Sequence, residues 1–154
     1  MIQQDKELLL KDLCARLPYG IVINTGDEDL KLDRQHQGIG VVYPEDCSDE
    51  FNERNNNASF YITISGCYYG EEIKPYLRPM SSMTEEERKE WYATFESVYN
   101  LVPGGDPYNE DDYDDNWHEE PGIESFDYLN AHHFDYRGLI PKGLANEAPE
   151  GMYN

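Results

Sequence analysis

Residues 6–24 read KELLLKDLCARLPYGIVIN, a stretch that predicts a helix followed directly by a strand. Leucines recur at helical spacing among charged residues, so we expect an amphipathic helix over residues 4–17. Pro18 ends that helix, and the β-branched run at residues 21–24 then predicts a strand. A helix that leads directly into a strand favours a mixed α+β fold.

Further strand patterns follow this first stretch. Residues 38–43 (GIGVVY) and 59–65 (SFYITIS) are rich in β-branched and aromatic side chains, and Ser65-Gly66 suits a turn into another short strand. Residues 73–80 contain two prolines. Because proline cannot donate to a sheet ladder, this segment is expected to be an edge strand or a crossover.

Two more helical patterns lie toward the C-terminus. Thr84 and Glu87 match a capping box, and three glutamates follow Thr84 directly, so we expect a helix over residues 85–100. Ser125 is expected to cap a final helical region, and Asp135 a further turn. The tail beyond them stays ordered only if it docks on the domain.

These patterns predict one α+β domain over residues 1–154. We expect an N-terminal helix, a small antiparallel sheet or partly open barrel of four to five strands, and two C-terminal helical segments. Exposed acidic loops are expected at residues 44–58 and 104–124, because both stretches are rich in acids and poor in groups to bury.

The net charge of the chain limits the classes of partner that it is expected to bind. The net charge is −20 and the isoelectric point is near 4.3. Such a surface repels phosphate backbones and anionic lipids, so we expect no direct nucleic-acid binding and no membrane partner. The first residues lack a signal-peptide pattern, and the three cysteines are far apart, which together predict a cytoplasmic protein with reduced thiols.

Three sequence blocks resemble a known group of proteins. The blocks are KELLLKDLCARLPYG at residues 6–20, IKPYLRPMSSMTEEE at residues 73–87 and DYLNAHHFDYRGLI at residues 127–140. They resemble a family of small uncharacterised proteins of Bacteroides-type gut bacteria and of their phages and mobile elements. The resemblance implies a cytoplasmic protein, in the host cytosol if it is phage-encoded, and it implies no activity.

Catalytic and metal-binding patterns are weak. His132 and His133, near Asp127 and Asp135, could serve a small enzyme or a metal site, but adjacent histidines on a helix point about 100° apart. The alternative is that one histidine packs in the structure with a hydrogen bond while the other is exposed. We predict no catalytic residues, no metal site and no cofactor, so the protein is not expected to be an enzyme.

The segment 106–120 combines eight acids with aromatic side chains and has no lysine or arginine. Within this segment, the residues from Asp112 onward match the opening of an EF-hand loop, but Trp117 stands where that loop needs glycine. Tyrosine and tryptophan suit binding surfaces, although the aromatic side chains could instead fold back on the domain. The predicted partner-binding residues are Asp111, Asp112, Tyr113, Asp114, Asp115, Trp117, Glu119 and Glu120.

These observations predict a non-enzymatic acidic binding protein of phage or mobile-element origin. Its expected partner is a basic host or defence protein, which it engages or inhibits, and nucleic-acid mimicry is one form of this hypothesis. Two alternatives remain, namely a virion or assembly component and a small enzyme or metal-binding protein that uses the His132/His133 region. The sequence leaves the oligomeric state open.

Overall fold

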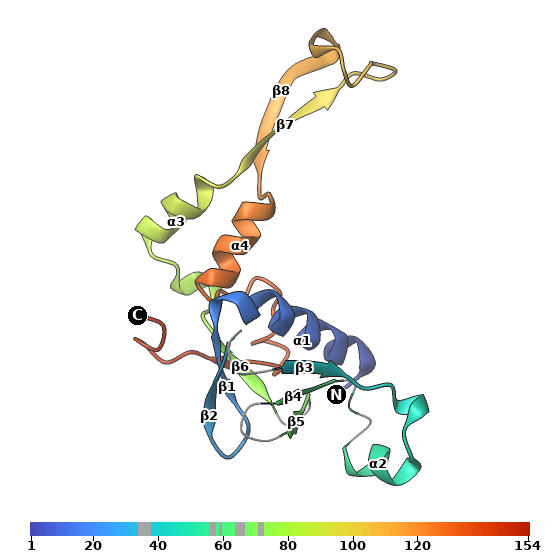
Figure 1. Ribbon diagram of the computed structural model, residues 1–154. Helices are drawn as coiled ribbons and strands as arrows, with labels where there is room; N and C mark the ends of the chain where they lie inside the picture. Colours follow the sequence, from blue (N-terminus) through green and yellow to red (C-terminus); the bar gives the residue numbers. More distant parts are fainter. Residues whose placement is uncertain (34–37, 56–57, 59, 64–66, 71–72) are drawn as a thin grey trace. The chain divides into compact units, whose positions relative to one another are not determined.

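The computed structural model describes residues 1–33, 38–55, 58, 60–63, 67–70 and 73–154 (Figure 1). These residues form two compact units, unit 1 (Met1–Ser82 and Asn130–Asn154) and unit 2 (Met83–Leu129). Helices and small, mostly antiparallel sheets make up the fold, so the predicted α+β class is confirmed. The described strands form no closed barrel.

Unit 1 contains two α-helices, three 3₁₀ helices and seven strands among its described residues. They are α1 (Gln3–Arg16), η1 (Leu17–Tyr19), β1 (Ile21–Asn24), β2 (Asp29–Leu32), β3 (Gly38–Val41), η2 (Pro44–Asp46), α2 (Asp49–Arg54), β4 (Phe60–Thr63), β5 (Cys67–Tyr69), β6 (Lys74–Leu77), η3 (Met80–Ser82) and β9 (Asn146–Glu147). Unit 2 contains α3 (Glu85–Tyr92), β7 (Glu96–Leu101), η4 (Glu110–Asp112), β8 (Tyr113–Glu120) and the start of α4 (Ile123–Ala131).

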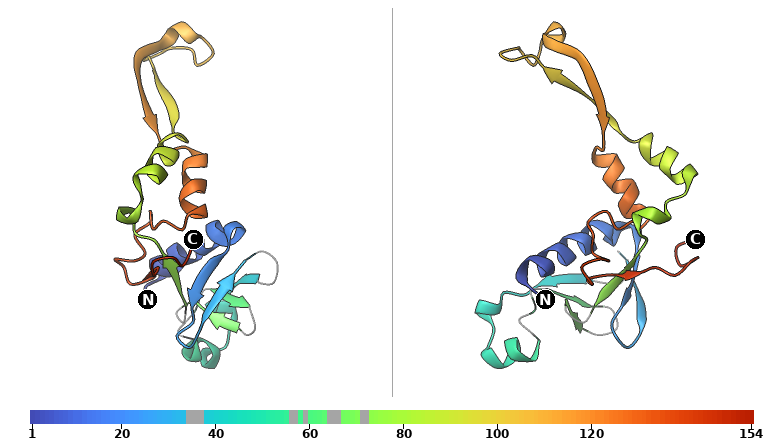
Figure 2. Two further views of the ribbon diagram at one scale, coloured as in Figure 1. Left: turned by 90° about the vertical axis from the view of Figure 1, so that its left-hand side faces the viewer. Right: turned by 180° about the vertical axis from the view of Figure 1, so that it is seen from behind.

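Two sheets and α1 build unit 1, as the views in Figures 1 and 2 show. One sheet has the order β2-β1-β6-β9 and the other β3-β4-β5, and all neighbours are antiparallel except β6 and β9. Apolar side chains from α1, from both sheets and from the segments that precede β6 and β9 form one buried core. Its residues are Leu9, Leu13, Ile21, Ile23, Leu32, Phe60, Ile62, Ile73, Leu77, Leu139, Leu144 and Ala145.

The first predicted helix and strand are confirmed as α1 and β1, and the predicted strand at residues 59–65 is confirmed where it is described, as β4. The expected turn at Ser65-Gly66 lies outside the described residues. The prediction for residues 73–80 is wrong in one respect, because β6 lies between β1 and β9 instead of at an edge. Only two residue pairs join β6 to β1, so Pro75 interrupts a very short ladder.

The predicted helix over residues 85–100 is wrong beyond Tyr92. Its start is confirmed, because Thr84 Oγ1 accepts the Glu87 amide (3.1 Å) and Glu87 Oε2 accepts the Thr84 amide (2.9 Å). The helix ends at Tyr92, and the Thr94 hydroxyl then donates to the Trp91 carbonyl at 2.6 Å. The chain continues as β7, because β8 supplies a pairing partner that residue-by-residue patterns do not reveal.

Both stretches predicted as acidic loops contain regular structure. Residues 113–120 form β8, and residues 49–54 form α2, whose Ser48 side chain accepts the Phe51 amide at 3.2 Å. Two acids in the first turn of α2 favour the helix through its dipole. The final helix also begins earlier than predicted, at Ile123. None of the helices within the described ranges has the length and apolar character required to cross a bilayer.

A buried ionic cluster joins α1 to the C-terminal segment of unit 1. The guanidinium of Arg16 is fully buried and donates to both oxygens of Asp12 at 2.8 and 3.0 Å. Arg137 also donates to Asp12, at 2.9 Å. Asp135 accepts the amides of Leu139 and Ile140, both at 2.8 Å, which confirms its predicted capping of that turn.

Candidate functional site

The β7–β8 hairpin of unit 2 carries the predicted partner-binding residues. Tyr99 of β7 lies directly opposite Trp117 of β8, and their ring centroids are 6.3 Å apart. Each side chain is 54% exposed, although aromatic residues of this size are usually covered. The two rings therefore form an exposed aromatic pair across the strands.

The acidic tip of the hairpin is ordered by its own side chains. Asp112 Oδ2 accepts the Asp106 amide at 2.8 Å, and Asp106 Oδ1 accepts the Tyr108 amide at 2.9 Å. The Tyr113 hydroxyl donates to the Pro107 carbonyl at 3.0 Å. Some carboxylates thus hold the backbone in turns, as Asp does in Asx turns, while others point their charge at solvent.

A hollow of about 470 Å³ lies on the hairpin and is lined by Tyr99, Glu110 and Tyr113. One carboxylate and two aromatic side chains therefore line the same hollow. Such a combination suits a cationic side chain, because an ammonium or guanidinium group can contact the ring faces and pair with the carboxylate.

The predicted residues lie on β8 and on the short helix η4 directly before it. Asp111 and Asp112 belong to η4, and the remaining predicted residues belong to β8. Asp111, Trp117, Glu119 and Glu120 are exposed, and Tyr113 is partly buried, whereas the side chain of Asp115 lies outside the described part of the structure. Trp117 is 54% exposed, so the described residues do not bury it.

Sequence reasoning missed Tyr99 and Glu110. Tyr99 was assigned to a helix, so its position opposite Trp117 could not be seen. The available signal was the run ESVYNL at residues 96–101, whose Val98 and Tyr99 favour a strand and which precedes a Pro-Gly turn pattern.

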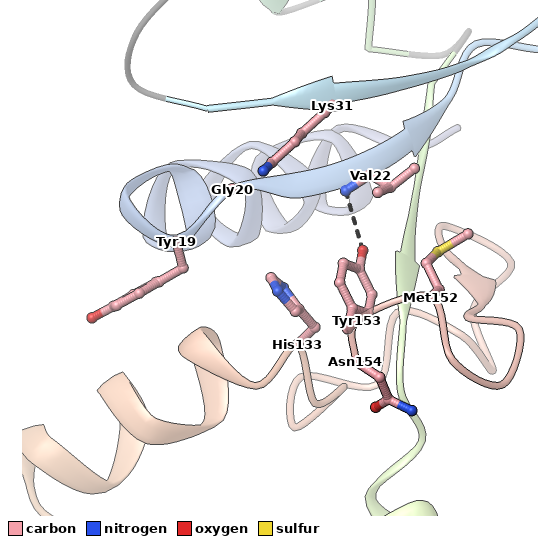
Figure 3. Close-up of a pocket in the computed structure, with 8 residues that line it drawn as sticks. All are labelled: Tyr19, Gly20, Val22, Lys31, His133, Met152, Tyr153 and Asn154. Atoms are coloured by element: carbon pink, nitrogen blue, oxygen red, sulfur yellow. Dashed lines mark hydrogen bonds between the residues drawn. The ribbon is translucent and has the colours of Figure 1, made fainter.

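A second candidate site is a pocket of about 280 Å³ in unit 1, drawn in Figure 3. It lies where the start of β1, the turn after α4 and the C-terminus meet. Its lining residues are Tyr19, Gly20, Val22, Lys31, His133, Met152, Tyr153 and Asn154.

His133 occupies this pocket in an unusual conformation. Its φ of 62° lies in the left-handed region, and its carbonyl accepts the Arg78 amide at 2.8 Å. The residue is 6% exposed, its ring stacks on Tyr153 with centroids 3.7 Å apart, and Nδ1 has no hydrogen-bond partner among the described residues. Burial, together with the positive charges of Arg16, His132, Arg78 and Lys31, lowers the pKa of His133 to about 4.

Tyr153 joins this pocket to the sheet. Its hydroxyl accepts the Val22 amide at 3.1 Å and donates to the Tyr76 carbonyl at 2.8 Å, so it bridges β1 and β6. Burial raises the pKa of Tyr153 to about 12. The C-terminal tail is therefore docked, and its β9 strand pairs with β6.

The histidine pair differs from the sequence expectation. His133 is the buried member, but within the described part of the chain its Nδ1 lacks the hydrogen bond expected of a packed histidine, while His132 is partly exposed. Asp135, considered as its acid–base partner, holds two backbone amides. Within the described ranges, no group of three or more His, Cys, Asp or Glu side chains is arranged to hold a metal ion.

Comparison with models of known protein families found no match to this chain, and comparisons with curated proteins and with solved structures found none either.

Proposed function

We propose that the protein is a non-enzymatic binding protein whose β7–β8 hairpin engages a basic protein. The observation that carries the proposal is the exposed Tyr99–Trp117 pair, which stands on a strand pair rich in carboxylates. Aromatic side chains supply binding energy when a partner covers them, and carboxylates select a partner of positive charge.

The construction of the hairpin supports this proposal. Among the described residues, β7 and β8 pair only with each other, so their outer edges carry unpaired backbone groups. A two-stranded sheet with exposed aromatic residues is marginally stable in water by itself. Glu96 also faces Glu120 across the strands, a like-charge pair that destabilises the free hairpin. A basic partner would relieve this repulsion and cover the aromatic pair.

The resemblance of the three sequence blocks extends the proposal to the origin of the protein, and the hairpin chemistry supplies the charge of its partner. We infer a phage or mobile-element protein that acts in the host cytosol on a basic host or defence protein. The acids of residues 44–58 would add to electrostatic attraction at long range, as those of the hairpin do.

Affinity capture with matched baits tests the proposal. The baits are the wild-type chain, a Tyr99→Ser/Trp117→Ser variant and an Asp111→Asn/Glu119→Gln/Glu120→Gln variant. Each is incubated with lysate of a Bacteroides-type host at 50 and 300 mM NaCl, and retained proteins are quantified by mass spectrometry. We expect a basic protein that the wild type retains at low salt, that higher salt releases, and that both variants lose.

Two control baits change exposed residues of unit 1. Tyr43→Ser removes an exposed aromatic side chain, and Asp27→Asn/Glu147→Gln/Glu150→Gln removes the same number of charges. Both should retain the basic protein. Equal retention by all baits, or retention that is indifferent to salt, would contradict the proposal. If added DNA or RNA competes with the chain for the basic protein, the chain binds it as a nucleic-acid mimic.

A further inference from the structure

The pocket around His133 contains polar groups that the hairpin proposal does not use. Its volume of about 280 Å³ lies just below the usual range for ligand sites, which suits a small ligand. His133 is 6% exposed, and no described residue forms a hydrogen bond with its Nδ1. Because an unpartnered buried polar atom costs free energy, folded proteins retain few of them, and those retained often serve a function.

The position of the imidazole is imposed by its surroundings. A φ of 62° is uncommon for a residue other than glycine, although histidine tolerates it better than most. The Arg78 amide holds the His133 carbonyl, and the ring lies on Tyr153, which two hydrogen bonds fix to β1 and β6. Figure 3 shows the imidazole directed from the turn after α4 toward the start of β1. The structure therefore presents this ring in one orientation.

One cationic side chain, Lys31, lines the pocket, in a chain whose net charge is −20. Lys31 extends across Gly20, where a Cβ would lie 3.0 Å from Lys31 Cε, so the glycine leaves room for the lysine stem. Within the part of the chain that is described, the Lys31 ammonium makes no ion pair. Its charge acts on the His133 imidazole, as do those of Arg16 and Arg78.

We propose that this pocket binds a small oxyanion, the carboxylate or phosphate group of a small molecule. Lys31 supplies the ion pair, and the Nδ1–H tautomer of His133 donates a hydrogen bond to an anion oxygen once the ligand displaces the atoms that cover Nδ1 in the free protein. A ligand that accepts this hydrogen bond satisfies the buried Nδ1 atom. The site lies in unit 1 and is independent of the hairpin.

Nuclear magnetic resonance of the full-length ¹⁵N-labelled chain tests this site. Sodium phosphate and sodium acetate are titrated separately at pH 7, with sodium chloride at matched ionic strength as the reference. We expect saturable shifts of the Val22, Lys31, His133 and Tyr153 amides with at least one oxyanion and none with chloride. A response to phosphate alone or to acetate alone distinguishes the two ligand groups.

Three variants separate the site from general charge effects. Lys31→Gln and His133→Asn should each weaken oxyanion binding at least about tenfold, because each removes one charge-assisted contact. Asparagine tolerates positive φ, so His133→Asn keeps the backbone conformation. Lys11→Gln removes an exposed lysine of α1 and should leave the affinity unchanged. Shifts that are absent, that do not saturate, that chloride reproduces, or that Lys11→Gln weakens as much as Lys31→Gln would overturn the proposal.

Discussion

Unit 1 and the hairpin of unit 2 place their large side chains in opposite environments. In unit 1, Leu9, Ile23 and Phe60 are fully buried, and even Arg16 and Asp12 are removed from water. In the hairpin, Tyr99 and Trp117 are each 54% exposed. Burial of apolar area stabilises a fold, whereas exposed aromatic area can stabilise only a complex. We infer that unit 1 supplies the stability of the fold and that the hairpin supplies the surface that contacts a partner.

The buried ion pair of unit 1 offers the largest test of this difference. Asp12→Ala leaves Arg16 and Arg137 without their carboxylate and should lower the free energy of unfolding by about 3–5 kcal/mol. Glu50→Ala breaks a pair of the same spacing with Arg54, but both side chains are exposed, so its cost should stay below about 1 kcal/mol. Urea unfolding measures both free energies, and similar losses for the two variants would contradict the buried pairing of Asp12 with Arg16 and Arg137.

The second prediction concerns pH. Because the pKa of His133 is lowered to about 4 from an ordinary value near 6.5, the unfolded chain binds the proton more readily. The contribution of His133 is therefore complete above about pH 6.5 and is lost as the pH falls toward 4. Between pH 7 and 4.5 the wild type should lose about 2 kcal/mol more than His133→Asn. Urea titrations of both proteins at the two pH values measure these losses. Equal losses in the wild type and in His133→Asn would contradict a lowered pKa of His133.

A smaller effect is expected at the C-terminal tyrosine. Tyr153→Phe removes the hydroxyl that bridges the Val22 amide and the Tyr76 carbonyl, and should cost about 1–2 kcal/mol. Tyr108→Phe serves as the control, because Tyr108 is 96% exposed and should show no change. Thermal unfolding of both variants compares them, and an unchanged midpoint for Tyr153→Phe would argue against the bridge.

The smallest expected change in stability lies in the hairpin. Trp117→Ser should alter the unfolding of unit 1 by less than about 0.5 kcal/mol, as exposed substitutions usually do. Both tryptophans, Trp91 and Trp117, belong to unit 2, so the unfolding of unit 1 is followed instead through the nuclear magnetic resonance signals of the α1 and β1 amides during a urea titration. A loss of stability in unit 1 comparable to that of Tyr153→Phe would mean that Trp117 is a structural residue.

Local patterns predicted the elements that short-range physics determines. Leucine spacing and Pro18 predicted α1 and β1. The capping-box pattern of Thr84 and Glu87 predicted the start of α3, and their reciprocal hydrogen bonds confirm it. Pairing between distant segments was not visible, so β7 was assigned to a helix and β8 to a loop. The same limit hid the bridge formed by Tyr153, because its partners lie 77 and 131 residues away.

The candidate sites follow the same rule. The acidic and aromatic composition of residues 106–120 drew attention to Trp117 and its neighbours, but composition could not place Tyr99 beside them. Asp12 and Arg16 were expected on the polar face of an amphipathic helix, yet both are fully buried because they neutralise each other there. The pocket of His133 depends on a left-handed backbone and a docked tail, which no local pattern specifies.

Amide hydrogen exchange of the full-length chain, free and with the basic protein retained in the capture experiment, tests the central claim most directly. In the free protein, the amides of β7 and β8 should exchange at least about a hundredfold faster than those of Ile21, Ile23 and Ile62, because they open locally. Addition of the partner should slow exchange in β7 and β8 and leave β1 and β4 unchanged. Equal protection of both regions in the free chain, or partner-induced protection confined to unit 1, would contradict the account.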